Sequence, residues 1–383
     1  MKDYKRLGDY IREVNVRNRE LEVTDLLGVS ISKEFMPSIA NTIGTDMSTY
    51  KLVKRGQFAY GPVTSRNGDK VSIALLNGYD DAIISQAYTV FEIIDHDALL
   101  PEYLMMWFRR PEFDRYARFH SHGSAREVFD WDELCDVKPP IPSITRQREI
   151  VAEYETLTHR IRLNEQMIQH LETTAQALYR KMFVDGIDKE NLPEGWKMGT
   201  IEELGKVITG KTPSSENPED FGDEMPFVAP GDFSNYKKFA IGAERMLSSI
   251  GIKRLKGKVL PKGSVIVTCI GSDMGKVAIA SENCVTNQQM NSIVVSSNEY
   301  SDYLFYALSS ISKELKAMAL GSSTMPLLNK SDFEQIEIII PPFELLREFS
   351  EITSKGNTIV ILKLKENKKL TELQSLLLAK MGQ

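Results

Sequence analysis

The sequence has few cysteines and no long hydrophobic run, and these absences exclude several classes of protein. Its three cysteines, Cys135, Cys269 and Cys284, form no CxxC pair and lack the histidine spacing typical of zinc sites. We therefore expect buried thiols, a reducing compartment and no bound metal. No apolar run approaches the roughly 18 residues that a membrane span needs, and the first residues lack the apolar region of a signal peptide. The sequence predicts a cytoplasmic protein without membrane association.

Motifs for catalysis are missing or incomplete. Residues 271–277 resemble a phosphate-binding loop, but only three residues separate the glycines and a valine follows the lysine, which favours a hairpin turn. Residues 340–343 resemble the motif with which adenine methyltransferases hold the target base, except that isoleucine replaces the polar residue. Residues 302–316 mimic the spacing of a nuclease metal site that the first half of the chain does not keep. His120 and His122 have no third ligand nearby. The chain by itself is predicted to be non-catalytic.

The strongest positive feature is an internal repeat. A Gly-Ser segment, an acidic stretch, an Ile-Pro pair and a long helical pattern occur in this order from residue 123 and again from residue 321. Glu149 and Glu348 lie 199 residues apart, and so do Met182 and Met381. This constant offset predicts two copies of a globular unit followed by a helix, related by pseudo-twofold symmetry.

The predicted fold class is α+β, with two similar mixed α/β domains. Short β-type runs separated by turn signals precede one helix in each half, over about 101–119 and about 302–320. Clear strand candidates in the second half are residues 265–268, 276–280 and 291–295. The predicted segments are a first domain at 1–142, a long helix at 143–185, a second domain at 191–341 and a second long helix at 342–383.

The long helices have the periodicity of a coiled coil. In the first, mainly apolar residues recur at alternating spacings of four and three from Ile150 to Met182. The second is less regular, and we expect a break or stutter near Gly356. Its apolar seam is predicted to contain Phe349, Ile352, Ile359, Leu362, Leu370, Leu373, Leu377 and Met381. Asn164 lies in the first seam, where a buried polar residue usually fixes register; a solvated position is the alternative.

Two such helices, each following its own domain, pack most simply as an antiparallel pair between the domains. A helix of 40 residues spans about 60 Å at ~1.5 Å per residue, so the pair would act as a rigid spacer. Ordinary amphipathic helices within compact domains are the alternative interpretation. The residues expected to hold the spacer together are Leu157, Ile161, Leu171, Leu178, Leu370 and Leu377.

The charge distribution suits a nucleic-acid partner better than the net charge does. The net charge of −6 opposes binding to phosphates, because lysine and arginine dominate that affinity. Between Arg245 and Ser272, however, the chain has six basic residues and no acidic one. A local basic face can bind DNA within a larger complex, although solvated surface charge also produces such runs.

Several short segments together resemble the specificity subunit of type I restriction–modification enzymes. They are Leu192–Lys197, Gly210–Ser214, Pro226–Val228, Gly231-Asp232, Leu260–Val265, Asn287–Gln289 and Ile340–Pro342. The first half departs from this pattern: it lacks the Gly-x-Thr-Pro element, and Tyr4–Gly8 leads to Arg17-Asn18 and an insert through Tyr50. The first half is similar to another branch of the domain family, which suggests that the two halves read different DNA sequences.

The resemblance implies a subunit that recognises a bipartite, asymmetric site in double-stranded DNA through two target recognition domains. It also implies two modification (methyltransferase) subunits and restriction/translocase subunits as partners. Together these would form a type I site-specific deoxyribonuclease and adenine-N6 DNA methyltransferase. S-adenosylmethionine, ATP and magnesium are then expected on the partners, and no cofactor on this chain. The alternatives are the specificity subunit of a type II system with a fused methyltransferase–endonuclease partner, an enzyme in its own right, and a coiled-coil adaptor that never touches DNA.

Base readout needs Arg or Lys toward guanine and Asn or Gln toward adenine, with phosphate contacts setting position. The residues expected to contact DNA in the first half are Arg55, Tyr60, Arg66, Asn67, Lys70 and Arg126. Those in the second half are Lys211, Thr212, Ser214, Lys237, Lys238, Lys253, Lys256, Ser272 and Thr324. The segment Asn287–Gln289 is suited to adenine but borders a strand, so a structural role is equally compatible.

Overall fold

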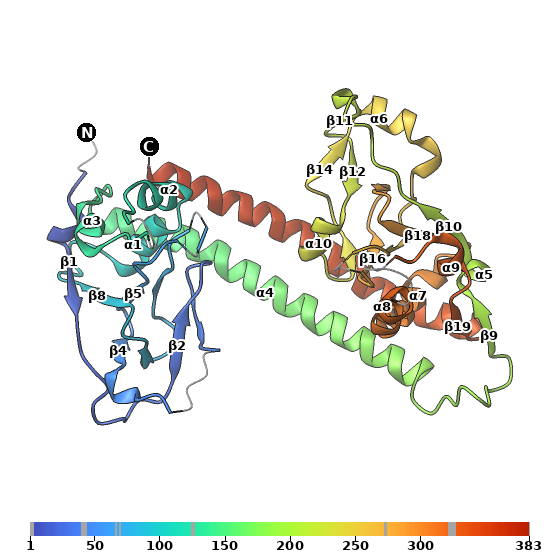
Figure 1. The fold of residues 1–383 in the computed structure, drawn as a ribbon, viewed down its shortest axis with the longest axis horizontal. Helices are drawn as coiled ribbons and strands as arrows, with labels where there is room; N and C mark the ends of the chain where they lie inside the picture. The colour runs from blue at the N-terminus through green and yellow to red at the C-terminus, as the bar shows by residue number, and fades with distance from the viewer. Residues whose placement is uncertain are drawn as a thin grey trace. The chain divides into compact units, whose positions relative to one another are not determined.

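The computed structural model of the chain divides into two compact units, each with its own globular head (Figure 1). Unit 1 comprises Met1–Ile161 and Lys369–Gln383, and unit 2 comprises Arg162–Lys368. The residues that the structure describes are 4–39, 44–65, 67–68, 70–123, 127–271, 274–320 and 327–382. None of the described helices combines the length and apolarity that crossing a membrane requires. Each unit contains part of both long helices.

The head of unit 1 contains two four-stranded sheets. The first has the order β1-β8-β5-β6 and is antiparallel throughout: Ile11–Val14, Thr89–Ile93, Phe58–Tyr60 and Ile73–Leu75. The second has the order β3-β2-β7-β4, with β2 and β7 parallel: Phe35–Pro37, Leu26–Val29, Asp81–Ile84 and Lys51–Lys54. Phe58 stacks on Phe91 with ring centroids 4.8 Å apart, and Phe108 meets Phe58 edge-on at 6.0 Å. This aromatic cluster fixes the helices against the first sheet.

The helix predicted at about 101–119 is two helices, α1 (Pro101–Phe108) and α2 (Pro111–Phe119). Pro111 has no N–H and pushes Arg110 into an extended conformation with φ −72° and ψ 137°, which ends the first helix. The helix predicted at about 302–320 is likewise two, α7 (Glu299–Ser310) and α8 (Ser312–Leu320), which separate at Ile311. A third helix in unit 1, α3, covers Trp131–Asp136.

The head of unit 2 repeats the two-sheet plan with additions. Its five-stranded sheet has the order β10-β18-β15-β16-β13: Gly205–Thr209, Met290–Val295, Val265–Thr268, Val277–Ala280 and Phe239–Ala240. The four-stranded sheet is β11-β14-β12-β17: Phe221–Gly222, Arg245–Leu247, Met225–Val228 and Val285–Thr286. A two-stranded sheet pairs β19 (Glu337–Ile340) with β9 (Lys197–Thr200), and the short helices are α5 (Ile201–Leu204), α6 (Ser249–Arg254) and α9 (Lys330–Glu334). The three strands predicted in this half are confirmed, each within two residues.

One tyrosine anchors each head to the segment before its long helix. The Tyr103 hydroxyl donates to the carbonyl of Pro140 at 2.9 Å, and the Tyr303 hydroxyl donates to the carbonyl of Ile339. Pro140 and Ile339 lie 199 residues apart, so the two copies keep the same contact. The repeat is therefore visible in hydrogen bonding as well as in strand order.

The long helices are α4 (Ile144–Phe183) and α10 (Phe343–Met381). In unit 1, Gln374 Nε2 donates to Thr158 Oγ1 at 2.7 Å. In unit 2, Asn164 Nδ2 donates to Asn367 Oδ1 at 2.8 Å, and Gly356 packs against Leu171, so α4 and α10 run antiparallel there. Asn164 is 2% exposed, so its seam position is buried and hydrogen-bonded. The role of α4 and α10 as a spacer that holds the two heads at a fixed separation stays a prediction.

The predicted seam residues of α4 face inward, whereas the seam predicted for α10 is partly wrong. Every predicted α4 position from Ile150 to Met182 is at least half-buried, including all the spacer residues expected on this helix. On α10, Leu370 and Leu377 are half-buried, but four predicted seam residues are exposed: Ile352, Ile359, Leu362 and Leu373. Phe349 and Met381 are buried as predicted, and the helix also buries Leu346, Thr353, Val360 and Leu378. It continues through Gly356 and keeps heptad-type spacing there, so the predicted break or stutter is also wrong.

Candidate nucleic-acid interface

In unit 1, the loop between β5 and β6 meets the segment before α3. Val63 and Val128 form an isolated antiparallel bridge. The Thr64 amide donates to the carbonyl of Glu127 at 3.0 Å, and the Phe129 amide donates to the carbonyl of Pro62 at 2.9 Å. These backbone bonds hold two sequence-distant loops together, and we call this meeting point the loop junction.

Unit 2 has the same loop junction between the segment after β15 and the segment before α9. Ile270 bridges Leu327, and the Leu328 amide donates to the carbonyl of Cys269 at 3.0 Å. Val128 and Leu327 lie 199 residues apart, as do Phe129 and Leu328. The repeated Gly-Ser segments, which begin at Gly123 and at residue 321, directly precede these bridges.

Polar side chains reinforce the loop junction of unit 1. Thr64 Oγ1 donates to Ser121 Oγ at 3.0 Å, and Ser121 Oγ donates to the carbonyl of Ala117 at 2.7 Å. Asn67 Nδ2 lies 3.3 Å from the Val63 carbonyl and 3.4 Å from Ser72 Oγ. Beside Asn67 is a hollow of about 300 Å³ that Tyr88 also lines. Tyr88 is a candidate contact that the sequence analysis missed, because it lies 21 residues from Asn67 in the chain.

The two loop histidines converge on one carboxylate. His120 Nδ1 lies 2.9 Å from Glu133 Oε2, and His122 Nε2 lies 3.6 Å from Glu133 Oε1. Tyr116 stacks on His120 with ring centroids 4.2 Å apart. Among the described residues, no group of three His, Cys, Asp or Glu side chains is arranged to hold a metal ion. This arrangement ties the segment before α3 to α3 itself.

The residues predicted to contact DNA in the first half have varied environments. Lys70 is exposed, and Arg55 is exposed with Nη2 2.8 Å from Asp80 Oδ1. Arg66 and Arg126 lie outside the described residues. Tyr60 is a correction: it is 1% exposed and its hydroxyl donates to the carbonyl of Phe129 at 3.1 Å. Because the ring belongs to the aromatic core, Tyr60 cannot reach DNA.

In the second half, five of the predicted contacts are exposed: Lys211, Ser214, Lys237, Lys253 and Lys256. Thr212 is half-buried and its hydroxyl donates to Gln288 Oε1. Ser272 and Thr324 lie outside the described residues. Lys238 is a second correction, since it is 4% exposed and its Nζ lies 2.7 Å from Asp302 Oδ1. Burial and pairing with Asp302 remove Lys238 from the candidate interface.

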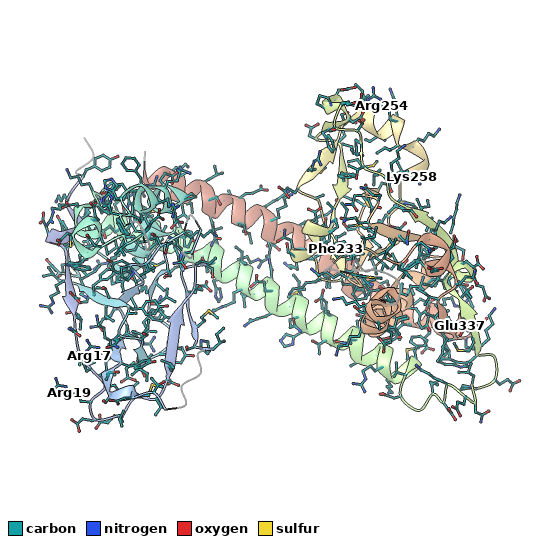
Figure 2. The ribbon with its side chains drawn as sticks, viewed as in Figure 1. Arg17, Arg19, Phe233, Arg254, Lys258 and Glu337 are labelled. Carbon is teal, nitrogen blue, oxygen red and sulfur yellow. The ribbon has the colours of Figure 1, made fainter. Side chains whose placement is uncertain are left out.

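The basic segment near α6 contains both paired and unpaired cations. Arg254 Nη1 lies 2.9 Å from Glu219 and 2.8 Å from Asp220, and Lys258 Nζ donates to the carbonyl of Thr209 at 2.9 Å (Figure 2). In the part of the chain that the structure describes, Lys253 and Lys256 have no recorded ion pair. These two lysines are therefore available to phosphates.

The first head also has two arginines that were not among the predicted DNA contacts. Arg19 is exposed, whereas Arg17 is half-buried and its Nη1 donates to the carbonyl of Thr49 at 2.6 Å (Figure 2). They lie in the part of the chain where the first half departs from the family pattern, which is why motif matching passed over them. They are further candidates for phosphate contact.

The three thiols are buried. Burial raises the pKa of the Cys269 thiol to about 11 and that of the Cys284 thiol to about 12. Desolvation likewise raises the pKa of Cys135. A thiol with a raised pKa is a poor nucleophile at neutral pH, so these residues are packing groups.

Comparison with known proteins agrees with this architecture. Residues 193–372 match the family model for the type I restriction modification DNA specificity domain. The chain is 27% identical to the type I restriction enzyme HindI specificity subunit of Haemophilus influenzae, over 100% of this chain and 99% of that protein. The chain belongs to the specificity subunits of type I restriction–modification enzymes.

Other relatives of this specificity subunit match in part or in fold. It is 30% identical to the type I restriction enzyme MjaIX specificity subunit of Methanocaldococcus jannaschii, over 49% of this chain and 43% of that protein. The crystal structure of the S subunit of the type I system of M. genitalium has the same fold, with a TM-score of 0.66 and 14% identity over 100% of this chain and 96% of that one. The type II alternative is not favoured. Specificity subunits of type I systems are in general non-catalytic.

Proposed function

We propose that this specificity subunit reads a bipartite, asymmetric DNA site, with one half-site for each head. The observation that carries the proposal is the loop junction, which has the same antiparallel bridge and one equivalent backbone hydrogen bond in both units but different side chains around it. Asn67, Lys70 and Tyr88 flank it in unit 1, whereas Lys276 flanks it in unit 2. Two heads that share the loop junction but carry different side chains around it would read two different half-sites.

Cationic residues of the two heads would position them on the phosphates of DNA. Lys253 in α6 and Lys256 after it are exposed, and in the first head Arg19 is exposed and Arg17 half-buried. Each phosphate that such a cation neutralises releases counterions and steepens the salt dependence of binding. Because the net charge of the chain is −6, the affinity would depend on these local groups.

The chemistry would lie on partner subunits. Two modification subunits with S-adenosylmethionine would methylate adenine at N6, and restriction subunits with ATP and magnesium would cut DNA. This chain would supply the sequence specificity and would hold no cofactor. The assembly would then be an adenine-N6 DNA methyltransferase and a type I site-specific deoxyribonuclease.

The exposed face of α10 is the surface that we assign to a modification subunit. In unit 2, Ile352 is 55% exposed, Ile359 40% and Leu362 60%. Apolar residues gathered on one helix face are typical of a surface that a partner protein buries. The same residues explain why the second helix has more apolar positions than its seam requires.

The salt dependence of DNA binding tests the proposal. In the double variant Lys253→Ala and Lys256→Ala, two phosphate contacts are lost, so the slope of log affinity against log salt should fall by about two. The matched control is Lys181→Ala with Lys189→Ala, which removes two exposed lysines elsewhere in the chain. Equal slopes for both variants would contradict the role of the α6 segment. Binding that does not depend on salt would favour the adaptor hypothesis instead.

A further inference from the structure

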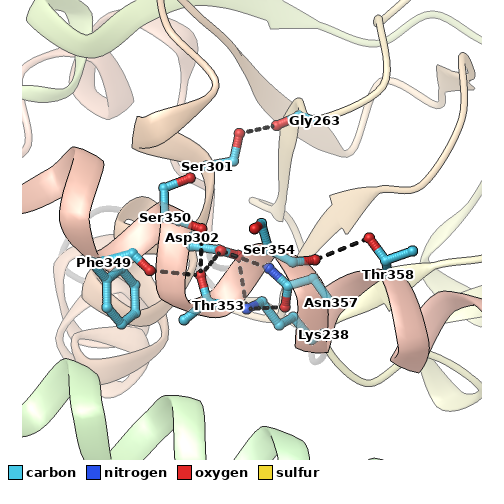
Figure 3. Close-up of polar contacts among 10 residues, drawn as sticks. All are labelled: Lys238, Gly263, Ser301, Asp302, Phe349, Ser350, Thr353, Ser354, Asn357 and Thr358. Carbon is cyan, nitrogen blue, oxygen red and sulfur yellow. Dashed lines mark hydrogen bonds and ion pairs between the residues drawn. The ribbon is translucent and has the colours of Figure 1, made fainter.

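Unit 2 contains a buried polar cluster centred on Asp302 (Figure 3). Lys238 Nζ lies 2.7 Å from Asp302 Oδ1, and the two side chains are 3% and 8% exposed. Thr353 Oγ1 and Asn357 Nδ2 each donate to Asp302 Oδ2 at 2.6 Å. Lys238 Nζ also donates to Asn357 Oδ1 at 3.0 Å, which closes a ring of contacts. We call these four residues the Asp302 cluster.

The Asp302 cluster joins the second head to the long helix. Lys238 precedes β13 and Asp302 lies in the first turn of α7, so both belong to the head. Thr353 and Asn357 lie one turn apart on α10 and face the head together. The ammonium of Lys238 also lies 4.9 Å from the centre of the Tyr306 ring. All four residues are in unit 2, and they converge from three separate parts of the chain.

The first copy of the repeat does not have this cluster. The positions 199 residues before Thr353 and Asn357 are Tyr154 and Thr158, and Tyr154 packs in the apolar core of unit 1. The fold of a head on its helix therefore does not require the cluster. A buried ion pair also costs desolvation energy that well-packed apolar residues would avoid. What the cluster adds is a set of hydrogen bonds that form only in one relative orientation of the head and the helix.

Directional bonds select one register where apolar packing would allow several. Moving a residue by one position along a helix shifts it by ~1.5 Å and turns it by about 100°. Such a shift would separate Thr353 and Asn357 from Asp302, whereas apolar side chains are less sensitive because hydrophobic burial is non-directional. The cluster therefore penalises neighbouring registers of the head on α10.

We infer that the Asp302 cluster fixes the orientation of the second head on α10 and thereby sets the spacer length that the subunit accepts between its half-sites. This inference rests on the proposed function, because a spacer exists only if both heads read DNA at once. The four residues act as positioning residues and touch no base. Loss of the cluster would relax spacing while leaving each half-site unchanged.

The test uses the full complex with its modification subunit. Libraries of DNA would contain the two half-sites at the native spacer and at spacers one base pair longer or shorter, and adenine methylation would be counted by long-read sequencing. The variants are Asn357→Leu and the double variant Lys238→Met with Asp302→Leu, which replaces the ion pair by apolar groups of similar size. The expected result is about tenfold more methylation at the altered spacers relative to the native one, the scale of one lost hydrogen bond.

A second buried ion pair provides the matched control. Lys33 Nζ lies 2.6 Å from Asp114 Oδ1 in the first head, with side chains 6% and 13% exposed, and neither residue lies on a long helix. The double variant Lys33→Met with Asp114→Leu should leave the spacer preference unchanged. The inference is overturned if the Asp302-cluster variants keep the wild-type spacer profile, or if the control relaxes it equally.

Loss of folding in these variants would not end the test. In that case Thr353→Val, which removes only one hydroxyl donor, decides the question by the same spacer profile. A wild-type complex that methylates no bipartite site would instead overturn the proposed function itself. The two failures are therefore distinguishable, because the first leaves the wild-type motif intact.

Discussion

Replacing Gln147 by leucine should destabilise the first head without affecting the second. Gln147 is fully buried, and its Oε1 accepts from the Leu100 amide at 2.9 Å. Its Nε2 donates to the carbonyls of Ala98 and Pro142, both at 2.9 Å. The amide thus joins the start of α1 to the start of α4. The position 199 residues later is Leu346, which is 1% exposed and makes apolar contacts only.

The size of the effect follows from these three hydrogen bonds. Each lost bond that leaves a buried partner unsatisfied costs about 1–3 kcal/mol, and burial of the new leucine returns about 2 kcal/mol. The net cost is therefore about 1–7 kcal/mol, with a centre of about 4 kcal/mol, which raises the population of locally opened unit 1 by roughly 1,000-fold. Hydrogen exchange measured peptide by peptide should show this acceleration around residues 95–105.

The control is Leu346→Met, a volume-conserving change that costs under about 1.5 kcal/mol. It should accelerate exchange slightly in unit 2 and leave unit 1 unchanged. The reasoning would be refuted if Gln147→Leu altered exchange around residues 95–105 by less than about threefold. Equal acceleration in both units would also refute it, because the three hydrogen bonds all lie in unit 1.

Three further predictions concern other parts of the molecule. Burial raises the pKa of Glu172, so as pH rises above about 4.5 the unfolded state loses this proton before the folded state does, and the stability of the fold decreases. The variant Glu172→Gln should lack this decrease when stability is measured by chemical denaturation at several pH values. Parallel pH profiles for the variant and the wild type would contradict the prediction. The double variant Leu171→Asp and Leu370→Asp should disrupt the helix pair, because it puts two carboxylates at half-buried positions where a fully buried leucine would be worth roughly 1.5–3 kcal/mol, and an unchanged small-angle scattering profile would remove the spacer hypothesis. Cys269 and Cys284 should resist iodoacetamide at pH 7.5 until the protein is denatured, whereas labelling of the native chain would show that they are accessible.

Much of the architecture was predictable because local signals and the repeat agree. The heptad spacing after Pro142 predicts α4 almost to the residue, and the β-branched run at 265–268 is the central strand β15. The same signals were only partly right for α10, which has apolar residues on two faces. Its seam is decided by Thr353 and Asn357, whose partners Asp302 and Lys238 lie far away in the chain. The periodicity of a sequence shows which positions are polar, but it does not show which polar side chains are buried by hydrogen bonds to residues far away in the chain.

The candidate site was less predictable for a related reason. Tyr60 and Lys238 have the residue types of DNA contacts and lie near turns, but the fold turns both side chains into buried contacts. Burial of a single side chain depends on tertiary neighbours such as Phe129 and Asp302. The internal repeat, by contrast, correctly indicated a shared element, because the loop junction keeps its antiparallel bridge and one equivalent backbone hydrogen bond in both units.

Mapping of methylated adenines tests the central claim most directly. The chain would be co-expressed with the modification subunit encoded beside it, in a host that lacks adenine methylation, and the genome would be read by long-read sequencing. The account predicts a single bipartite motif with two unlike half-sites and one fixed spacer. A stable complex that methylates nothing, or that methylates a continuous or symmetric motif, would contradict it.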